Sequence, residues 1–200
     1  MRQIYLFTDG GAFSENYKDY EMCSAFVMHV DEHKLCEKSY YEEEGTSPRA
    51  EIYGINKGLK EVLSLMETVP DDYSIHLFTD SELCYLSLTQ WIFGWIKRAG
   101  GIDNEYKGGK TKKAVANQDL IREAYKSILE ITNKAKFRMY HINSHVPVVR
   151  LAEAYEKFNK YNKVAVSPQF FKFCYENNRR CDALVKEKYE EITNKKENNK

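Results

Sequence analysis

Hydrophobic and polar positions alternate in the first part of the chain and recur at helical spacing further on. Residues 2–8 alternate and are rich in β-forming side chains, so they predict a strand that ends at Asp9. The runs 21–30 and 34–43 have the same character and are separated by a short polar turn. Together they predict a β-hairpin that follows the first strand.

The first predicted helix begins at Ser47 and Pro48, because a capping residue followed by proline is typical of a helix N-terminus. Its apolar positions keep helical spacing as far as Met66. A short apolar run then predicts a central strand that ends at Asp80. The central strand and the elements after it are predicted at 74–79 (strand), 81–97 (helix), 118–132 (helix) and 136–142 (strand).

The C-terminal part is predicted to be helical. Residues 148–162 have a helical pattern, and Ser167-Pro168 predicts a second helix that passes through Asp182 to about Ile192. The polar segment 194–200 is expected to be a frayed tail. Strands first and then alternating strands and helices predict an α/β fold, with a mixed five-stranded sheet that is antiparallel at its start, parallel at its centre and covered by helices on both faces.

Composition narrows the class of protein. A chain of 200 residues with 42% hydrophobic residues suits a single domain, expected over 1–193. Basic and acidic residues balance at 30 each, so a polyanionic partner has to be recognised by a local surface. Five cysteines without a CxxC pair favour reduced thiols, and no signal-peptide pattern or membrane-length apolar stretch is present. We expect a cytoplasmic protein without membrane contact, and a monomer.

Four acidic residues lie where they could converge. Asp9 and Asp80 each end a predicted strand after Phe-Thr, and Glu51 and Asp182 lie on the first and last predicted helices. Alone, a strand-end aspartate is most often a turn former, and a helical acid is most often a dipole partner or a solvated charge. Together they match the ligand set that two divalent cations need to cleave a phosphodiester. The joint pattern therefore indicates a nuclease.

Six segments then resemble one family. FTDGGA, TSPRAE, FTDSELCYLSLTQWIFGWIKR, KKAVANQDL, INSH and NNRRCDALVKE occur in the order found in type 1 ribonuclease H. The resemblance implies a ribonuclease H-like fold and cleavage of the RNA strand of RNA–DNA hybrids with two Mg²⁺ ions, or with Mn²⁺ as a substitute, leaving 5′-phosphate and 3′-hydroxyl ends. It implies that Asp9 bridges both metals, that Glu51 and Asp182 hold one each, and that Asp80 helps to bind the metal near the nucleophile.

The resemblance also assigns a role to His145, which follows the last predicted strand. In the family a mobile histidine here assists proton transfer or product departure, whereas a lone histidine is usually structural. Ser144 and Val146 replace the family's flanking glycines, and the 37 positions from His145 to Asp182 contain a predicted helical insertion at about 147–176.

Two interpretations of this insertion remain open. It is either a cap that extends the last helix backwards, or an element that contacts the substrate through aromatic rings and lysines. Helical spacing favours inward packing for the phenylalanines, and the lysines are undecided. The side chains concerned are Phe170, Phe171, Phe173, Tyr175, Lys157, Lys160, Lys163 and Lys172.

A basic segment lies just after the second tryptophan of TQWIFGW. Residues 97–113 carry six basic and two acidic side chains, within an expected protrusion at about 97–116. An isolated charge run is usually a solvated loop. Beside a phosphodiesterase centre we interpret it as a nucleic-acid contact. The expected nucleic-acid-binding residues are Gly10, Gly11, Ala12, Ser47, Arg49, Ser81, Trp91, Trp95, Lys97, Arg98, Lys112, Lys113 and Asn117.

Two other functions remain possible. The first is a nuclease of the same fold that acts on a different nucleic acid, although 3′–5′ exonucleases of this superfamily carry Asp-x-Glu in the first strand and position 11 here is glycine. The second is a nucleic-acid-binding module that lost its chemistry, which usually loses one or more of the acids. All four are present, so the expected partner is an RNA–DNA hybrid that the enzyme cuts.

Overall fold

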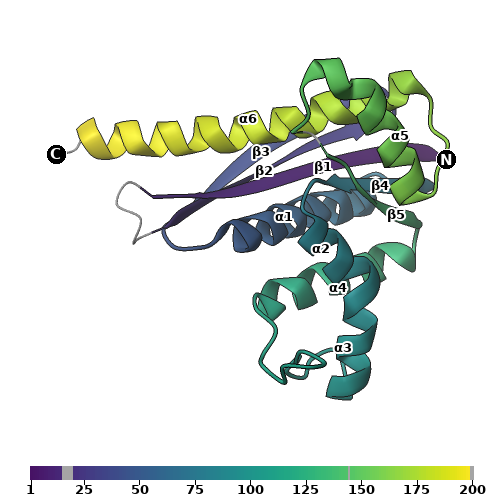
Figure 1. Cartoon of the computed structure of the whole chain (residues 1–200). Helices are drawn as coiled ribbons and strands as arrows, with labels where there is room; N and C mark the ends of the chain where they lie inside the picture. The colour runs from purple at the N-terminus through teal and green to yellow at the C-terminus, as the bar shows by residue number, and fades with distance from the viewer. Residues whose placement is uncertain (15–19, 144, 199–200) are drawn as a thin grey trace.

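One mixed sheet forms the centre of the protein (Figure 1). The computed structural model describes residues 1–14, 20–143 and 145–198, so Ser144 and the last two residues of the expected tail lie outside the described residues. The five strands have the order β3-β2-β1-β4-β5. Their bounds are Arg2–Phe13 (β1), Glu21–Val30 (β2), His33–Glu42 (β3), Tyr73–Thr79 (β4) and Lys136–His141 (β5).

The pairing of the strands follows the predicted scheme. β1 pairs antiparallel with β2 and parallel with β4, and β4 pairs parallel with β5. The sheet is therefore antiparallel at its start and parallel at its centre, which confirms the predicted fold class. The helical elements are α1 (Ser47–Thr68), α2 (Glu82–Leu86), a π-helical turn η1 (Ser87–Trp91), α3 (Ile92–Ala99), α4 (Gln118–Thr132), a 3-10 turn η2 (Val148–Arg150), α5 (Leu151–Asn162) and α6 (Pro168–Asn198).

Helices cover both faces of the sheet because successive strand side chains point to opposite sides. In β1, Leu6 packs with the α1 and α4 residues Ile55, Leu59 and Ile128, whereas Phe7 packs with residues of α5 and α6. In Figure 1, α6 spans one face of the sheet and α1 lies on the other. Two apolar cores therefore hold the sheet between them.

The first strand is longer than its pattern predicts. β1 continues to Phe13 because β2 keeps pairing with it through the contact of Phe13 with Glu21. The parallel pairing with β4 ends earlier, at Thr8 and Thr79. Asp9 therefore lies within β1 but beyond the last residue of β1 that pairs with β4.

The C-terminal helix contradicts one expectation. α6 continues to Asn198, so residues 194–198 are helical and the prediction of a frayed segment is wrong for them. The reason is tertiary: Lys196 forms an ion pair with Glu21 and donates a hydrogen bond of 3.0 Å to the Tyr41 hydroxyl. These contacts fasten the last turns of α6 to β2 and β3.

The insertion forms α5 and the first turns of α6. Ala154, Phe158 and Phe171 are buried against the sheet face that carries Phe7 and Phe78. The phenylalanines of the insertion thus pack inward, in agreement with the cap interpretation. Within the described residues, no helix is both long and apolar enough to cross a membrane.

Candidate active site

Two of the predicted acids become neighbours through the register of the central strands. Thr8 of β1 pairs with Thr79 of β4, so the next residues, Asp9 and Asp80, leave adjacent parallel strands at the same edge. Ligand sites of open α/β sheets lie at this carboxyl edge. Ser81 then caps α2 by accepting a hydrogen bond from the Cys84 amide, which turns the chain away directly after Asp80.

A close contact between β1 and α1 adds the third acid. A Cβ atom on Gly10 would lie 2.3 Å from the carbonyl carbon of Ala50 and 2.4 Å from the amide nitrogen of Glu51. A Cβ on Gly54 would lie 2.9 Å from the carbonyl oxygen of Asp9. Because neither position has a side chain, the first turns of α1 rest on the β1 backbone and present Glu51 beside Asp9.

The three carboxylates form one cluster. Asp9, Glu51 and Asp80 each offer an oxygen atom, and these atoms all lie within 4.8 Å of one another. Asp9 is only 5% exposed, and one of its oxygens accepts a hydrogen bond of 2.7 Å from the Gly10 amide. Glu51 Oε2 is buried and has no hydrogen-bond partner within the described part of the chain.

Burial and mutual repulsion favour the neutral forms of these acids. Burial, reinforced by Asp80, raises the pKa of Asp9, although the Gly10 amide partly opposes the shift. Burial, reinforced by Asp9 and Asp80, raises the pKa of Glu51 well above its usual range. A hard divalent cation would relieve this repulsion and provide a partner for Glu51 Oε2, so the all-oxygen donor set fits a divalent metal ion.

The fourth acid lies beside this cluster. Asp182 on α6 is outside the group of three, but it is close enough for its charge to contribute to the raised pKa of Asp9. Its carboxylate is bound at 2.7 Å by Lys186, one turn further along the helix. Lys186 was not among the residues predicted from the sequence, although its i,i+4 spacing to Asp182 is a usable signal for such a pair.

His145 lies at the edge of the cluster. Its Nε2 atom is 3.1 Å from Asp80 Oδ2, and its side chain is 66% exposed while that of Asp80 is 6% exposed. β5 ends at His141, so His145 lies in the loop that follows this strand. An exposed imidazole next to a buried carboxylate can carry a proton between solvent and the site.

Neighbouring cysteines do not offer a nucleophile. Burial raises the pKa of Cys84 to about 12 and raises that of Cys181 well above its usual range. Neither thiol is ionised at neutral pH, and a thiol is a weak nucleophile compared with a thiolate. The chemistry of the site therefore rests on the carboxylates and His145.

Several predicted nucleic-acid contacts already have partners within the protein. Ser47 Oγ accepts a hydrogen bond of 3.2 Å from the Ala12 amide, which joins the start of α1 to β1. Arg49 forms a bidentate pair with Asp119 at 3.1 and 2.8 Å and also donates to Asn117 Oδ1 at 3.4 Å. Arg49 thus ties α1 to α4. Gly10 and Gly11 directly follow Asp9 on β1.

The two tryptophans and Asn117 line one cavity of about 470 Å³, together with Thr46 and Pro48 at the start of α1. Trp91 is 43% exposed, and its ring centroid lies 5.9 Å from that of Trp95. The structure thus brings together Trp91, Trp95 and Asn117, which are separated in the sequence. The exposed ring of Trp91 suits contact with a nucleic-acid sugar or base.

The basic protrusion is an anchored loop. It begins with Lys97 and Arg98, both exposed in the last turn of α3. Tyr106 is fully buried beneath it and donates from its backbone amide to Gln118 Oε1 at 2.7 Å. The tip is a small turn in which Gly108 donates a backbone hydrogen bond to the Lys113 carbonyl, while Lys112 and Lys113 expose their side chains. The buried tyrosine holds these cations on a defined surface.

Comparisons with known proteins agree with this architecture. A mixed sheet with an acidic cluster at its carboxyl edge defines an α/β protein with a site suited to divalent metal, and solved structures share its fold. The RNase H domain of PFV superposes with a TM-score of 0.56 at 18% identity and covers 94% of each chain. A foamy viral protease-reverse transcriptase in complex with RNA/DNA hybrid matches 81% of this chain and 19% of its own, at a TM-score of 0.54 and 16% identity.

Sequence comparison gives the family. The family model for RNase H matches residues 1–165. The chain belongs to the RNase H family, which confirms the expected enzyme class, ribonuclease H. A ribonuclease H of Campylobacter jejuni is 23% identical over 146 residues, which is 72% of this chain and 81% of that protein. One of Treponema denticola is 29% identical over 127 residues, or 60% of this chain and 74% of that protein.

The family match ends before α6. Asp182 and Lys186 therefore lie beyond the matched residues, and the resemblance of segment NNRRCDALVKE and the position of α6 connect them with the site. Sequence reasoning also missed the close approach at Gly54, whose signal was a small residue one turn after Glu51 on an apolar helix face.

Proposed function

We propose that the protein is a divalent-metal-dependent endonuclease that hydrolyses the RNA strand of RNA–DNA hybrids and leaves 5′-phosphate and 3′-hydroxyl ends. One observation carries the proposal. Three carboxylate oxygens lie within 4.8 Å of one another at the carboxyl edge of the sheet, and a buried oxygen of Glu51 lacks a partner in the described residues. Such an arrangement costs stability unless a cation compensates it.

Each acid has a distinct place in the proposal. Asp9 is the most buried and central acid, so we assign it to both of two metal ions, with Glu51 and Asp182 holding one each. Asp80, which contacts His145, would help to hold one of the two ions. When bound, Mg²⁺ or Mn²⁺ lowers the pKa of an attacking water and stabilises the leaving 3′ oxygen.

His145 and Lys186 assist the acids. His145 is exposed beside Asp80, where it can pass a proton between solvent and the departing group. Lys186 forms an ion pair with Asp182 through Oδ2, so a metal ion held by Asp182 would share this carboxylate with the ammonium group.

The choice of hybrid as substrate rests on the family and on the surface beside the site. The curated relatives are ribonucleases H, and one solved structure of this fold holds an RNA/DNA hybrid. Gly10 and Gly11 are half-buried and follow Asp9 directly, and we place the recognition of a ribose 2′-hydroxyl beside them. The anchored basic loop and the cavity at Trp91 offer a second surface for the DNA strand.

The test uses labelled RNA–DNA hybrid, double-stranded RNA and double-stranded DNA, each with Mg²⁺, Mn²⁺ or EDTA. We expect cleavage of the RNA strand in the hybrid alone, only with metal, and 5′-phosphate ends on the products. Cleavage of a different duplex would favour a nuclease of the same fold with another substrate. Binding of hybrid without cleavage in either metal would leave a non-catalytic module.

A further inference from the structure

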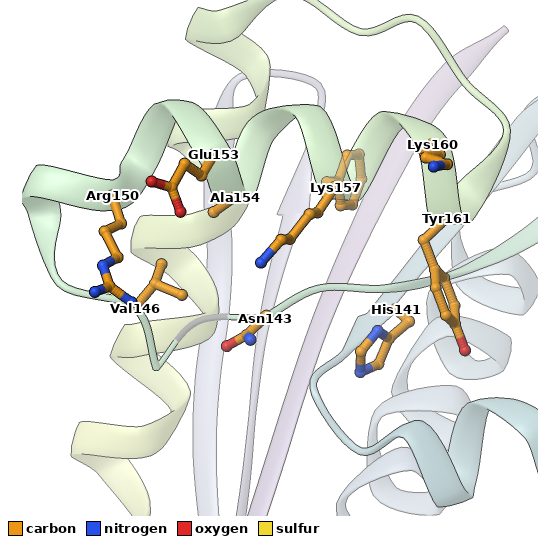
Figure 2. Close-up of a pocket in the computed structure, with 10 residues that line it drawn as sticks. His141, Asn143, Val146, Arg150, Glu153, Ala154, Lys157, Lys160 and Tyr161 are labelled. Atoms are coloured by element: carbon orange, nitrogen blue, oxygen red, sulfur yellow. The ribbon is translucent and has the colours of Figure 1, made fainter.

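A second cavity lies beside the acids, between α5 and the chain that follows β5. It has a volume of about 510 Å³, and the residues that give it its character are Arg150, Lys157, Lys160, Tyr161, His141 and Asn143. Figure 2 shows Lys157 extending from α5 toward the segment that carries Asn143. Tyr161 and His141 lie at one end of the cavity, and Arg150 and Val146 lie at the other (Figure 2).

The basic side chains of this cavity differ from most surface lysines because they have no acidic partner among the described residues. Among the described residues, none of Arg150, Lys157 and Lys160 forms an ion pair or a side-chain hydrogen bond, and Glu153 is the only acid in the lining. On α6, by contrast, Lys172 pairs with Glu176 and Lys186 with Asp182. Three cations gathered around a hollow with a single acid produce a local positive potential in a protein of zero formal net charge.

Hydrogen bonds connect the wall of the cavity to residues at the acidic site. His141 Nε2 donates a hydrogen bond of 3.1 Å to the backbone carbonyl of Asp80, and the other lining residue at this end, Tyr161, donates from its hydroxyl to Glu82 Oε1 at 2.9 Å. His145, in the loop that crosses beneath α5, reaches the Asp80 carboxylate. The wall of the cavity is thus attached to Asp80, which directly follows β4 and belongs to the acidic cluster.

The cavity is also preformed. The Asn162 side chain donates to the His141 carbonyl at 2.8 Å and accepts from the His141 amide at 2.9 Å, so the end of α5 is bound to the end of β5. At the other end, the Tyr175 hydroxyl of α6 donates to the Val146 carbonyl at 2.8 Å. A site fixed at both ends loses little conformational entropy when it takes up a ligand.

We propose that the cavity beside α5, which we call the α5 pocket, binds the sugar-phosphate backbone of the strand that is cut. The bound part of this strand lies on the side of the scissile phosphate that is next to Asp80. This inference rests on the proposed function. Lys157 and Lys160 contact phosphate oxygens, and the paired rings of His141 and Tyr161, with centroids 5.0 Å apart, provide a surface for a base or sugar. We assign the α5 pocket to the RNA strand because the scissile phosphate of that strand lies at the acids, and the pocket adjoins one of these acids, Asp80. The basic loop at residues 97–113 lies on the α3 side, away from α5 (Figure 1).

The test compares Lys157→Ala/Lys160→Ala with a matched variant, Lys136→Ala/Lys195→Ala, which removes the same charge from residues that do not line the pocket. On a long hybrid we expect the pocket variant to raise KM several-fold, to leave kcat unchanged, and to reduce the slope of log KM against log salt by about 2. The matched variant should resemble the wild type. Equal KM and equal slope in the wild type and the pocket variant would overturn the subsite while leaving the cleavage activity in place.

A second arm identifies the strand. Hybrids with uncharged methylphosphonate linkages in the RNA strand beyond the cleavage site should raise KM for the wild type and abolish the difference between wild type and pocket variant. The same linkages in the DNA strand should preserve that difference. Loss of the difference only with a modified DNA strand would overturn the assignment to RNA. A wild-type protein that neither binds nor cuts hybrid would instead overturn the proposed function, and the subsite with it.

Discussion

Arg180 on α6 forms a bidentate ion pair with Glu37 on β3, at 2.8 and 3.3 Å. The same guanidinium bonds Glu187 at 2.7 Å, so it is held on two sides. Asp182 lies two positions after Arg180, so the Arg180–Glu37 pair fastens α6 to β3 close to the fourth acid. The fourth acid is positioned by contacts with the far edge of the sheet.

The Arg180–Glu37 pair predicts a pH dependence of stability. Hydrogen bonds from Arg180 and then Lys34 lower the pKa of Glu37 to about 2. A lowered carboxyl pKa adds stability above the unfolded value of about 4.3, and this contribution disappears as pH falls toward 2. We expect Glu37→Gln to lower the Tm of the metal-free protein at pH 7 and to narrow this difference between pH 4.5 and 2.5. A difference that is constant with pH would contradict this role.

The close approach of α1 to β1 predicts that Gly10→Ala is far more damaging than Gly11→Ala. The new Cβ at position 10 would lie 2.3 Å from backbone, whereas at position 11 it would meet side chains of Phe13 and Val185 at 3.3 to 3.4 Å. Gly10→Ala should cost at least about 1–3 kcal/mol and displace Glu51, with loss of cleavage. Urea unfolding and a hybrid cleavage assay measure both effects. Equal behaviour of the two variants would contradict the contact.

The clustered acids predict that metal binding and stability are linked. Asp9→Asn replaces a buried carboxyl group, whose raised pKa reflects the cost of ionising it in the fold, by a neutral amide, so the metal-free variant should have a higher Tm than the metal-free wild type. Mg²⁺ should raise the Tm of the wild type and have little effect on the variant. Cleavage should be abolished while hybrid binding stays measurable. Full activity of the purified variant would refute the assignment of the metal site.

The anchored basic loop predicts an electrostatic contribution to substrate binding. Lys112→Ala/Lys113→Ala should raise KM and reduce the salt slope by about 2, since each lost phosphate contact removes about one unit. Lys60→Ala/Lys134→Ala is the matched control, because both lysines are paired with glutamates on α4, Glu123 and Glu130. If both double variants keep the wild-type slope, the loop does not contact nucleic acid.

His145 predicts a separable effect on turnover. Its side chain is 66% exposed, so His145→Ala should leave the Tm unchanged within about a degree. The lost proton carrier should lower kcat on the order of 10²-fold, with KM little changed. Single-turnover measurements at several pH values check this. An unchanged kcat would assign His145 to a structural role.

Most of the local structure followed from the pattern of hydrophobic and polar positions and from capping residues. Alternation located the strands, and Ser-Pro pairs located the starts of α1 and α6, because capping and proline act within a few residues. Asp9 and Asp80 were recognisable as strand-edge acids for the same reason. The register of Thr8 with Thr79, which makes these acids neighbours, is a pairing between strands that are distant in the sequence.

Long-range contacts determined the rest. β1 passes Asp9 because β2 pairs beyond it, and α6 reaches Asn198 because Lys196 binds Glu21 and Tyr41. The position of Asp182 depends on Arg180 and Glu37, which are 143 positions apart. The α5 pocket exists because Asn162 joins two elements of the fold. Local propensity specifies elements and their ends, whereas the convergence of the acids and the hollow beside them arise only from packing between segments that the sequence separates.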